Sequence, residues 1–278
     1  TIAKADAMSA NGYDLELTVT PAAVAGNGGT FTLSTDNLAE AVTCQLSWTA
    51  VQPTEAATVA TLKAANADEK YKFTGEAVVS FVDALNHVVY MQDANDGIRL
   101  LVDDVTNLKV GDVVSSQYIG FQNIAEGLTA IALTESLNVT VSGREIVAQE
   151  VSLATLAANA ADYINELVVV KNVRITDMTD PLYSTTPVAI NDGADGQLAP
   201  FASTDLIGSN KTANLFNLTG VALSNTAAVV APRAIADIQV LTAQLTVSPL
   251  SAQVANAFVG ESYTTTIKVF GSNLLSDV

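Results

Sequence analysis

An internal repeat constrains the fold of this chain more than any other feature of its sequence. The run Ala60–Leu62 recurs as Ala154–Leu156, at an offset of 154 − 60 = 94 residues. Further along, the run Val89–Gly97 recurs as Val188–Gly196, at an offset of 188 − 89 = 99 residues. A repeat of this kind means that one folding unit is used twice. We therefore expect two domains of the same fold in the middle of the chain.

Short apolar runs rich in Val, Ile, Thr and Tyr dominate both copies, separated by clusters of Gly, Asn and Asp. Such runs predict β-strands. Two short Ala-rich stretches, 56–67 and 153–164, predict helices. The expected class is all-β with minor helix, in which each copy is a small barrel of about five or six strands with one helix. The clearest strand runs are Ala77–Phe81, His87–Met91, Ile98–Val102, Val113–Ile119 and Leu167–Ile175.

An Asp-Gly dipeptide occupies the same place in both copies, ending in Gly97 and in Gly196. This dipeptide is typical of tight hairpin turns, because glycine readily adopts the positive φ that such turns need. We therefore expect both glycines at turn tips. Pro181 and Pro187 in the second copy predict an edge strand or a bulged strand in its hairpin.

The first copy resembles a known family. Its residues 72–80, 88–102 and 108–114 are similar to the OB-fold-like domains of Bacteroidota surface proteins and of accessory regions in secreted nucleases. The resemblance covers residues 54–240 when both copies are counted, although the second copy lacks a counterpart of Val110–Val113. It implies two OB-like β-barrels in tandem and a location outside the cell, at the cell surface.

The two ends of the chain also resemble each other, since Leu17–Pro21 parallels Leu245–Pro249. Both ends look like pieces of Ig-like repeats, but neither is long enough for the roughly seven strands of such a sandwich. We therefore expect four parts. They are a partial Ig-like β-sandwich segment at 1–52, OB-like barrels at 53–143 and 144–240, and a second partial Ig-like segment at 241–278.

The charge balance excludes several classes of partner. The net charge is −17, from 12 Lys and Arg against 29 Asp and Glu, and the basic residues are scattered. Nucleic-acid binding needs clustered cations that displace counterions, so it is not expected. No apolar run is long enough to cross a bilayer, so membrane insertion of this segment is not expected either.

The chain offers little to an enzyme mechanism. The single cysteine, Cys44, alternates with apolar residues and is expected in a core. Any histidine-dependent triad would have to use His87, the single histidine. It lies at the edge of a predicted hairpin loop, where a polar ring is ordinary, so a catalytic role is not expected. Phosphate-loop, nucleophile-elbow and metalloprotease motifs are missing from the sequence. We therefore expect a protein that is not an enzyme, although a pair of carboxylates that act together leaves no motif to find.

Acidic turns make calcium the one candidate cofactor. Calcium takes oxygen ligands from carboxylates and turn carbonyls, and both copies place Asp and Asn residues close together in a turn. Turn formation by the same residues is the alternative explanation. The candidate ligands are Asp93, Asn95, Asp96, Asp192 and Asp195.

Three aromatic residues of the first copy are candidates for a ligand platform: Tyr90, Tyr118 and Phe121. OB-type barrels bind oligosaccharides by stacking such rings on sugar faces. Core packing is the alternative role of rings on strands. A glycan-binding module of a cell-surface degradative system is accordingly the second functional hypothesis.

The leading hypothesis is an extracellular structural or adhesive module that associates with itself or with other surface proteins. An incomplete sandwich has open strand edges, and open edges are templates for another strand. The ends could meet within one chain, or one subunit could complete the next in a head-to-tail filament. We favour the second arrangement. The residues expected at this assembly interface are Tyr263, Ile267, Val269, Leu274, Leu15, Leu17 and Val19.

Overall fold

The computed structural model describes residues 29–33, 42–46, 52–124, 127–179, 182–253 and 256–274. The chain divides into two compact units, Thr1–Pro53 and Thr54–Val278. In the first unit, β1 (Gly29–Leu33) pairs antiparallel with β2 (Val42–Leu46), and Cys44 of β2 lies opposite Phe31. The predicted interface residues Leu15, Leu17 and Val19 lie outside the described residues.

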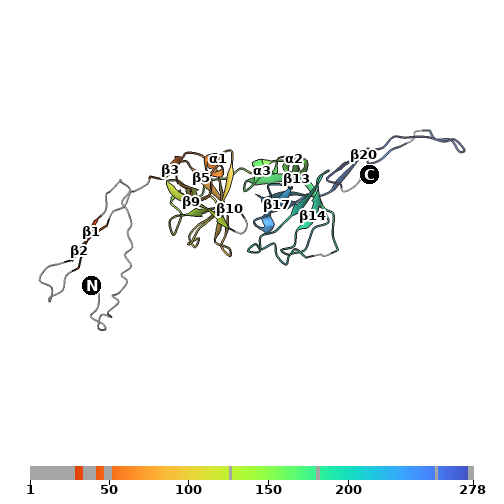
Figure 1. The fold of residues 1–278 in the computed structure, drawn as a ribbon. Helices are drawn as coiled ribbons and strands as arrows, with labels where there is room; N and C mark the ends of the chain where they lie inside the picture. Colours follow the sequence, from red (N-terminus) through yellow and green to blue (C-terminus); the bar gives the residue numbers. More distant parts are fainter. Residues whose placement is uncertain are drawn as a thin grey trace. The chain divides into compact units, whose positions relative to one another are not determined.

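The second unit begins with a β-barrel, barrel 1 (Figure 1). Its strands follow the order β11-β8-β5-β6-β7-β10-β9-β4-β3. They are β3 (Thr54–Ala56), β4 (Lys70–Phe73), β5 (Ala77–Asp83), β6 (Val88–Gln92), β7 (Gly97–Leu101), β8 (Val113–Val114), β9 (Gln117–Ile124), β10 (Gly127–Ala132) and β11 (Val139–Val141). One helix, α1 (Val59–Lys63), precedes β4.

Barrel 1 closes because β4 and β5 act as two halves of one long strand. The first half, β4, pairs with β9, and the second half, β5, pairs with β6. Parallel pairing of β10 with β7 completes the circuit. Its core includes Phe73, Met91 and Leu100, all fully buried.

Barrel 2 repeats this plan. The single strand β13 pairs with β16 through its first half and with β14 through its second, with a bulge between Val170 and Val173. The parallel β15–β17 pair corresponds to the β7–β10 pair of barrel 1. The elements are β12 (Gln149–Glu150), α2 (Leu153–Ala158), α3 (Ala160–Tyr163), β13 (Leu167–Ile175), β14 (Val188–Asn191), β15 (Asp195–Leu198), β16 (Phe216–Ala222), β17 (Val229–Ala231), the 3-10 turn η1 (Ile235–Asp237) and β18 (Ile238–Val240).

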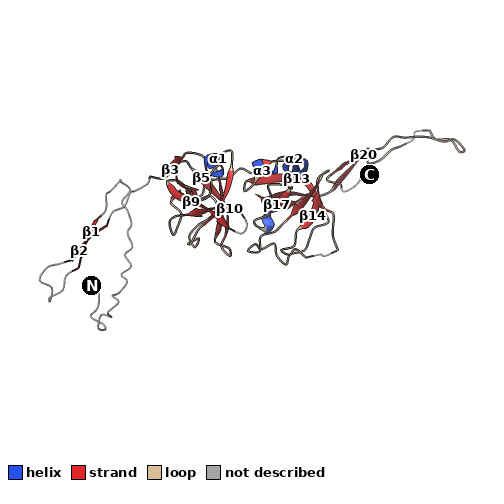
Figure 2. Cartoon of the chain, viewed as in Figure 1, coloured by secondary structure: helices blue, strands red, loops and turns tan. Residues whose placement is uncertain are grey.

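The predicted fold class is therefore confirmed: the described chain is mostly β, with two closed five-stranded barrels in tandem that are consistent with OB-like barrels. Strands dominate in Figure 2. The predicted helices at 56–67 and 153–164 are real but shorter, since α1 covers five residues and the second stretch breaks into α2 and α3. Within the described ranges, no helix has the length and apolar character needed to cross a lipid bilayer.

The predicted turn glycines are placed differently. Gly97 is the first residue of β7 and Gly196 the second of β15, and neither has a positive φ. Gly97 is required for a different reason, because a Cβ at this position would lie 2.4 Å from the backbone carbonyl of Asn165 in barrel 2. A Cβ at Gly196 would instead meet the side chain of Leu153 at 2.8 Å.

The contact at Gly97 belongs to a packed junction between the barrels. The rings of Phe81 and Phe201 stack with centroids 4.3 Å apart. The Leu167 N–H donates a 2.7 Å hydrogen bond to Gln92 Oε1. The buried apolar residues of the junction are Phe81, Val88, Tyr90, Leu167, Phe201, Val221 and Ala231.

The chain continues beyond barrel 2 into an antiparallel hairpin of β19 (Gln244–Ser248) and β20 (Lys268–Ser272). Among the described residues, these two strands form a sheet of their own. Each end of the chain thus contributes one two-stranded sheet to the described structure.

Replacing Gly97 with alanine is expected to destabilise the junction. The added methyl group would press on the Asn165 backbone, which cannot move as a flexible side chain can, and such overpacking costs about 1–3 kcal/mol. We expect chemical denaturation to show this loss. Hydrogen exchange of the Leu167 amide should accelerate in the same variant.

The matched control is Gly196→Ala, whose methyl group meets a side chain within barrel 2. This variant should leave the exchange of the Leu167 amide close to that of the parent protein. Equal acceleration in both variants would contradict the role given to Gly97.

Candidate functional site

The acidic turns hold the helices on the barrels. Asp93 Oδ2 accepts a hydrogen bond from the Val59 N–H at the start of α1, at 2.8 Å. In barrel 2, Asp192 Oδ2 accepts one from the Leu153 N–H at the start of α2, at 2.9 Å. A carboxylate at a helix start satisfies an otherwise unpaired backbone donor. The repeat in sequence is thus a repeated contact between turn and helix.

Several other carboxylate oxygens of these turns also accept hydrogen bonds. Asp93 Oδ1 accepts from the backbone N–H groups of Asn95 and Asp96, and Asp96 Oδ1 pairs with Lys63 Nζ at 2.8 Å. In barrel 2, Asp192 Oδ1 accepts from the Ala194 N–H. Asp195 Oδ1 accepts from Asn191 Nδ2 at 2.8 Å.

These hydrogen bonds match the turn-forming explanation of the acidic residues. Across the described part of the chain, there is no group of three or more His, Cys, Asp or Glu residues suited to a metal ion. Calcium binding by Asp93, Asn95, Asp96, Asp192 and Asp195 stays a prediction from the sequence.

Replacing Asp93 or Asp192 with alanine is expected to destabilise the protein by about 1–3 kcal/mol, because each change leaves a helix N–H without its charged acceptor. Thermal denaturation followed by circular dichroism measures the loss. Asp103→Ala, at an exposed position, is the control and should change stability by less than about 0.5 kcal/mol. Similar losses in all three variants would contradict the capping role.

The predicted aromatic platform is mostly buried. Tyr90 is only 6% exposed and packs against Phe81 and Phe201 in the junction. Phe121 is 5% exposed and meets Tyr71 edge to face within barrel 1. Tyr118 is half-buried. The platform expected from the sequence is therefore reduced to Tyr118, because the apolar rings gain more from packing than from exposure.

His87 lies in the turn between β5 and β6 with φ 54°, and its Nδ1 is 2.8 Å from the Asp103 carbonyl oxygen. This contact fixes the ring on the local backbone. It supplies no carboxylate or nucleophile for a triad.

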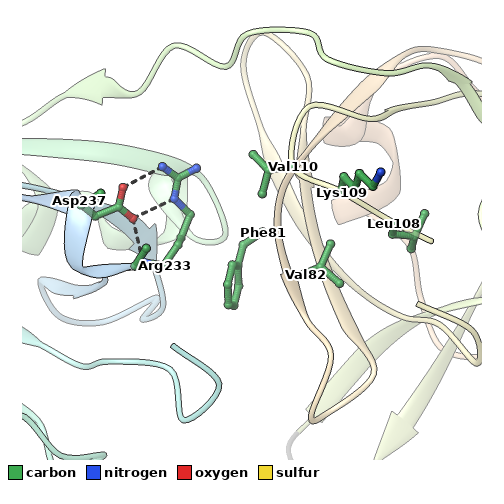
Figure 3. Close-up of a pocket in the computed structure, with 9 residues that line it drawn as sticks. Phe81, Val82, Leu108, Lys109, Val110, Arg233 and Asp237 are labelled. Carbon is green, nitrogen blue, oxygen red and sulfur yellow. Dashed lines mark hydrogen bonds and ion pairs between the residues drawn. The ribbon is translucent and has the colours of Figure 1, made fainter. Parts of the chain in front are cut away.

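A groove of about 530 Å³ runs along the junction (Figure 3). Its barrel 2 wall carries Arg233, whose guanidinium makes two 2.9 Å hydrogen bonds to the Asp237 carboxylate and a third, at 3.1 Å, to the Ser80 carbonyl oxygen of barrel 1. The opposite wall is largely apolar, with Phe81, Val82 and Val110. Arg233 therefore links the two barrels, and its guanidinium already donates to groups within the protein.

Glu166 is the residue of this region that the sequence analysis missed. Glu166 is only 5% exposed. Its pKa is raised to about 7, mainly by burial and also by the nearby carboxylates of Asp96 and Asp93, against the opposing attraction of Lys63. The sequence signal that could have pointed to Glu166 is its place in the repeat, immediately before the first long strand of barrel 2. Glu69 of barrel 1 occupies the matching place before β4, which marks both glutamates as members of a shared motif.

The C-terminal hairpin contains the remaining predicted interface residues. Val247 and Val269 lie directly opposite each other, so they share a face of the ribbon with Leu245. These three side chains are exposed, as are Ile267 just before β20 and Tyr263 in the connection, whose hydroxyl accepts from the Phe258 N–H. Leu274 is half-buried and lies close to Gly271.

Comparisons with known proteins add no relative: no protein-family model matches the chain, and no curated protein matches it at a significant level.

Proposed function

We propose that this protein is an extracellular structural subunit that associates with further copies by β-strand addition at its C-terminal hairpin. One observation carries the proposal: among the described residues, β19 and β20 form a two-stranded ribbon without a third strand, and apolar side chains of this ribbon face solvent. The location outside the cell rests on the resemblance of barrel 1 to surface proteins.

The ribbon is a poor structure on its own. A two-stranded hairpin is marginally stable in water, and it needs further strands or a packed face to persist. Leu245 is 59% exposed, Val269 49% and Phe270 57%, so neither face of the ribbon is covered by described residues. Exposed apolar patches with open strand edges mark interaction sites. The ribbon therefore favours a partner that supplies strands.

Charge supports a second copy of the chain as that partner. Copies that each carry a net charge of −17 repel one another over most of their surface. The segment 244–272, in contrast, contains only Glu261 and Lys268 as charged residues, and these cancel. Self-association is least opposed at this hairpin.

The N-terminal segment is the complementary element in our proposal. It also contributes a two-stranded sheet, β1 with β2, and its Leu17–Pro21 sequence parallels Leu245–Pro249 of the hairpin. Joining unlike ends of successive copies is a heterologous contact, which does not close and so produces a filament. Of the three rings proposed for the glycan-binding alternative, Tyr90 and Phe121 are buried and Tyr118 is half-buried.

The double variant Val247→Lys with Val269→Lys is expected to remove self-association, because two ammonium groups would have to be buried on the ribbon face that the partner covers. Sedimentation velocity over a concentration series measures the assembly of the complete chain. The parent protein should form species larger than a monomer, and the double variant should remain monomeric with an unchanged melting temperature of the barrels.

The matched control is Leu85→Lys, another exposed apolar position in the β5–β6 turn of barrel 1, which should assemble like the parent. A parent protein that stays monomeric at every concentration would overturn the proposal. So would a double variant that assembles as the parent does.

A further inference from the structure

The junction between the barrels buries an acidic side chain, one of whose carboxyl oxygens has no hydrogen-bond partner among the described residues. Glu166 directly follows Asn165, whose backbone fills the space beside Gly97. Its own backbone is satisfied, since its N–H donates to the Tyr163 carbonyl oxygen and its carbonyl accepts from the Ala222 N–H. Its side-chain Oε1, however, is buried and has no hydrogen-bond partner among the described residues.

The charged groups around Glu166 come from both barrels. Lys63 of α1 attracts its carboxylate, whereas Asp93 and Asp96 of the β6–β7 turn and Asp162 of α3 repel it. Lys63 is also the ion-pair partner of Asp96. An ionised Glu166 would thus share the attraction of Lys63 with three other carboxylates, in a place where it is only 5% exposed.

We propose that the junction is a proton-linked joint, closed while the Glu166 carboxyl group is neutral and loosened when it ionises. A neutral carboxyl group tolerates burial, whereas an unpaired buried carboxylate is costly. Separating the barrels would return the carboxylate to water and relieve its repulsion by Asp93 and Asp96. The joint would respond to pH in the same way in a monomer and in an assembly.

The direction of the pH dependence follows from proton binding. The closed junction holds the Glu166 pKa near 7, above the ordinary value of 4.5 that the open state would restore. The closed state therefore binds the proton more tightly than the open state. The stabilisation of the closed state by proton binding is complete below pH 4.5. This stabilisation is lost as the pH rises through the interval between the two pKa values.

The repeat supplies a matched control at Glu69. The Phe121 N–H donates to the Glu69 carbonyl, as the Ala222 N–H does to that of Glu166, so the two glutamates occupy equivalent backbone positions. The Glu69 carboxylate accepts hydrogen bonds from the Asn66 backbone, the Asn66 side chain and the Tyr71 hydroxyl, which lower its pKa. Glu69 therefore stays ionised throughout the neutral range.

Hydrogen exchange of the Leu167 amide tests the proposal, because this N–H donates across the junction to Gln92. Its protection factor, corrected for the intrinsic pH dependence of exchange, should fall roughly 30-fold between pH 5.5 and pH 8. Amides of the β13–β16 ladder inside barrel 2 should stay protected. A chelator in all samples removes any contribution from a divalent cation.

Glu166→Gln should keep the Leu167 amide protected at pH 8, whereas Glu69→Gln should reproduce the fall seen in the parent protein. If Glu166→Gln does not fold, the carboxyl carbon of Glu166 in the parent protein should titrate near pH 7 by NMR. The proposal is overturned by protection that is constant with pH, by an equal fall in Glu166→Gln, by loss of protection throughout β13–β16, or by titration of Glu166 near 4.5.

Discussion

The close approach of the Asn165 backbone to Gly97 is the contact on which the rest of the junction depends. A side chain at position 97 would hold the barrels apart, because its Cβ would fall within 2.4 Å of a backbone carbonyl group. With glycine there, Phe81 can stack on Phe201 and Leu167 can donate to Gln92. The same approach buries Glu166, so one missing methyl group sets both the packing of the joint and its proposed response to protons.

The two barrels share a fold but differ in the surface that barrel 1 presents to barrel 2 at the junction. At the places of Lys63 and Tyr90 in barrel 1, barrel 2 carries Ala157 and Ala189, which line a hollow of about 650 Å³ together with Gly196. This hollow lacks both the ring and the cation that the junction uses. Stacking of barrel 1 from another copy onto this hollow of barrel 2 would therefore gain little, which is consistent with placing the proposed assembly at the hairpin.

The hairpin and the barrels represent two solutions to one problem, the unpaired strand edge. Each barrel closes its sheet through one long strand that pairs on both sides, so its central strands have no open edge. The ribbon of β19 and β20 cannot close, because two strands have no third neighbour within the described residues. The protein thus combines closed barrel domains with a ribbon that exposes apolar faces and, among the described residues, unpaired strand edges.

The sequence by itself determined the repeat, the strand-rich class and the barrel fold of each copy, because periodicity and turn residues act locally and recur at matching places. It also located the acidic turns at Asp93 and Asp192, although not their role as acceptors for the helix starts. Only the tertiary structure decided what Gly97, Tyr90 and Glu166 do. Their roles depend on which surface of barrel 2 meets barrel 1, and residues such as Gln92 and Leu167, 167 − 92 = 75 positions apart, meet only once both barrels have closed.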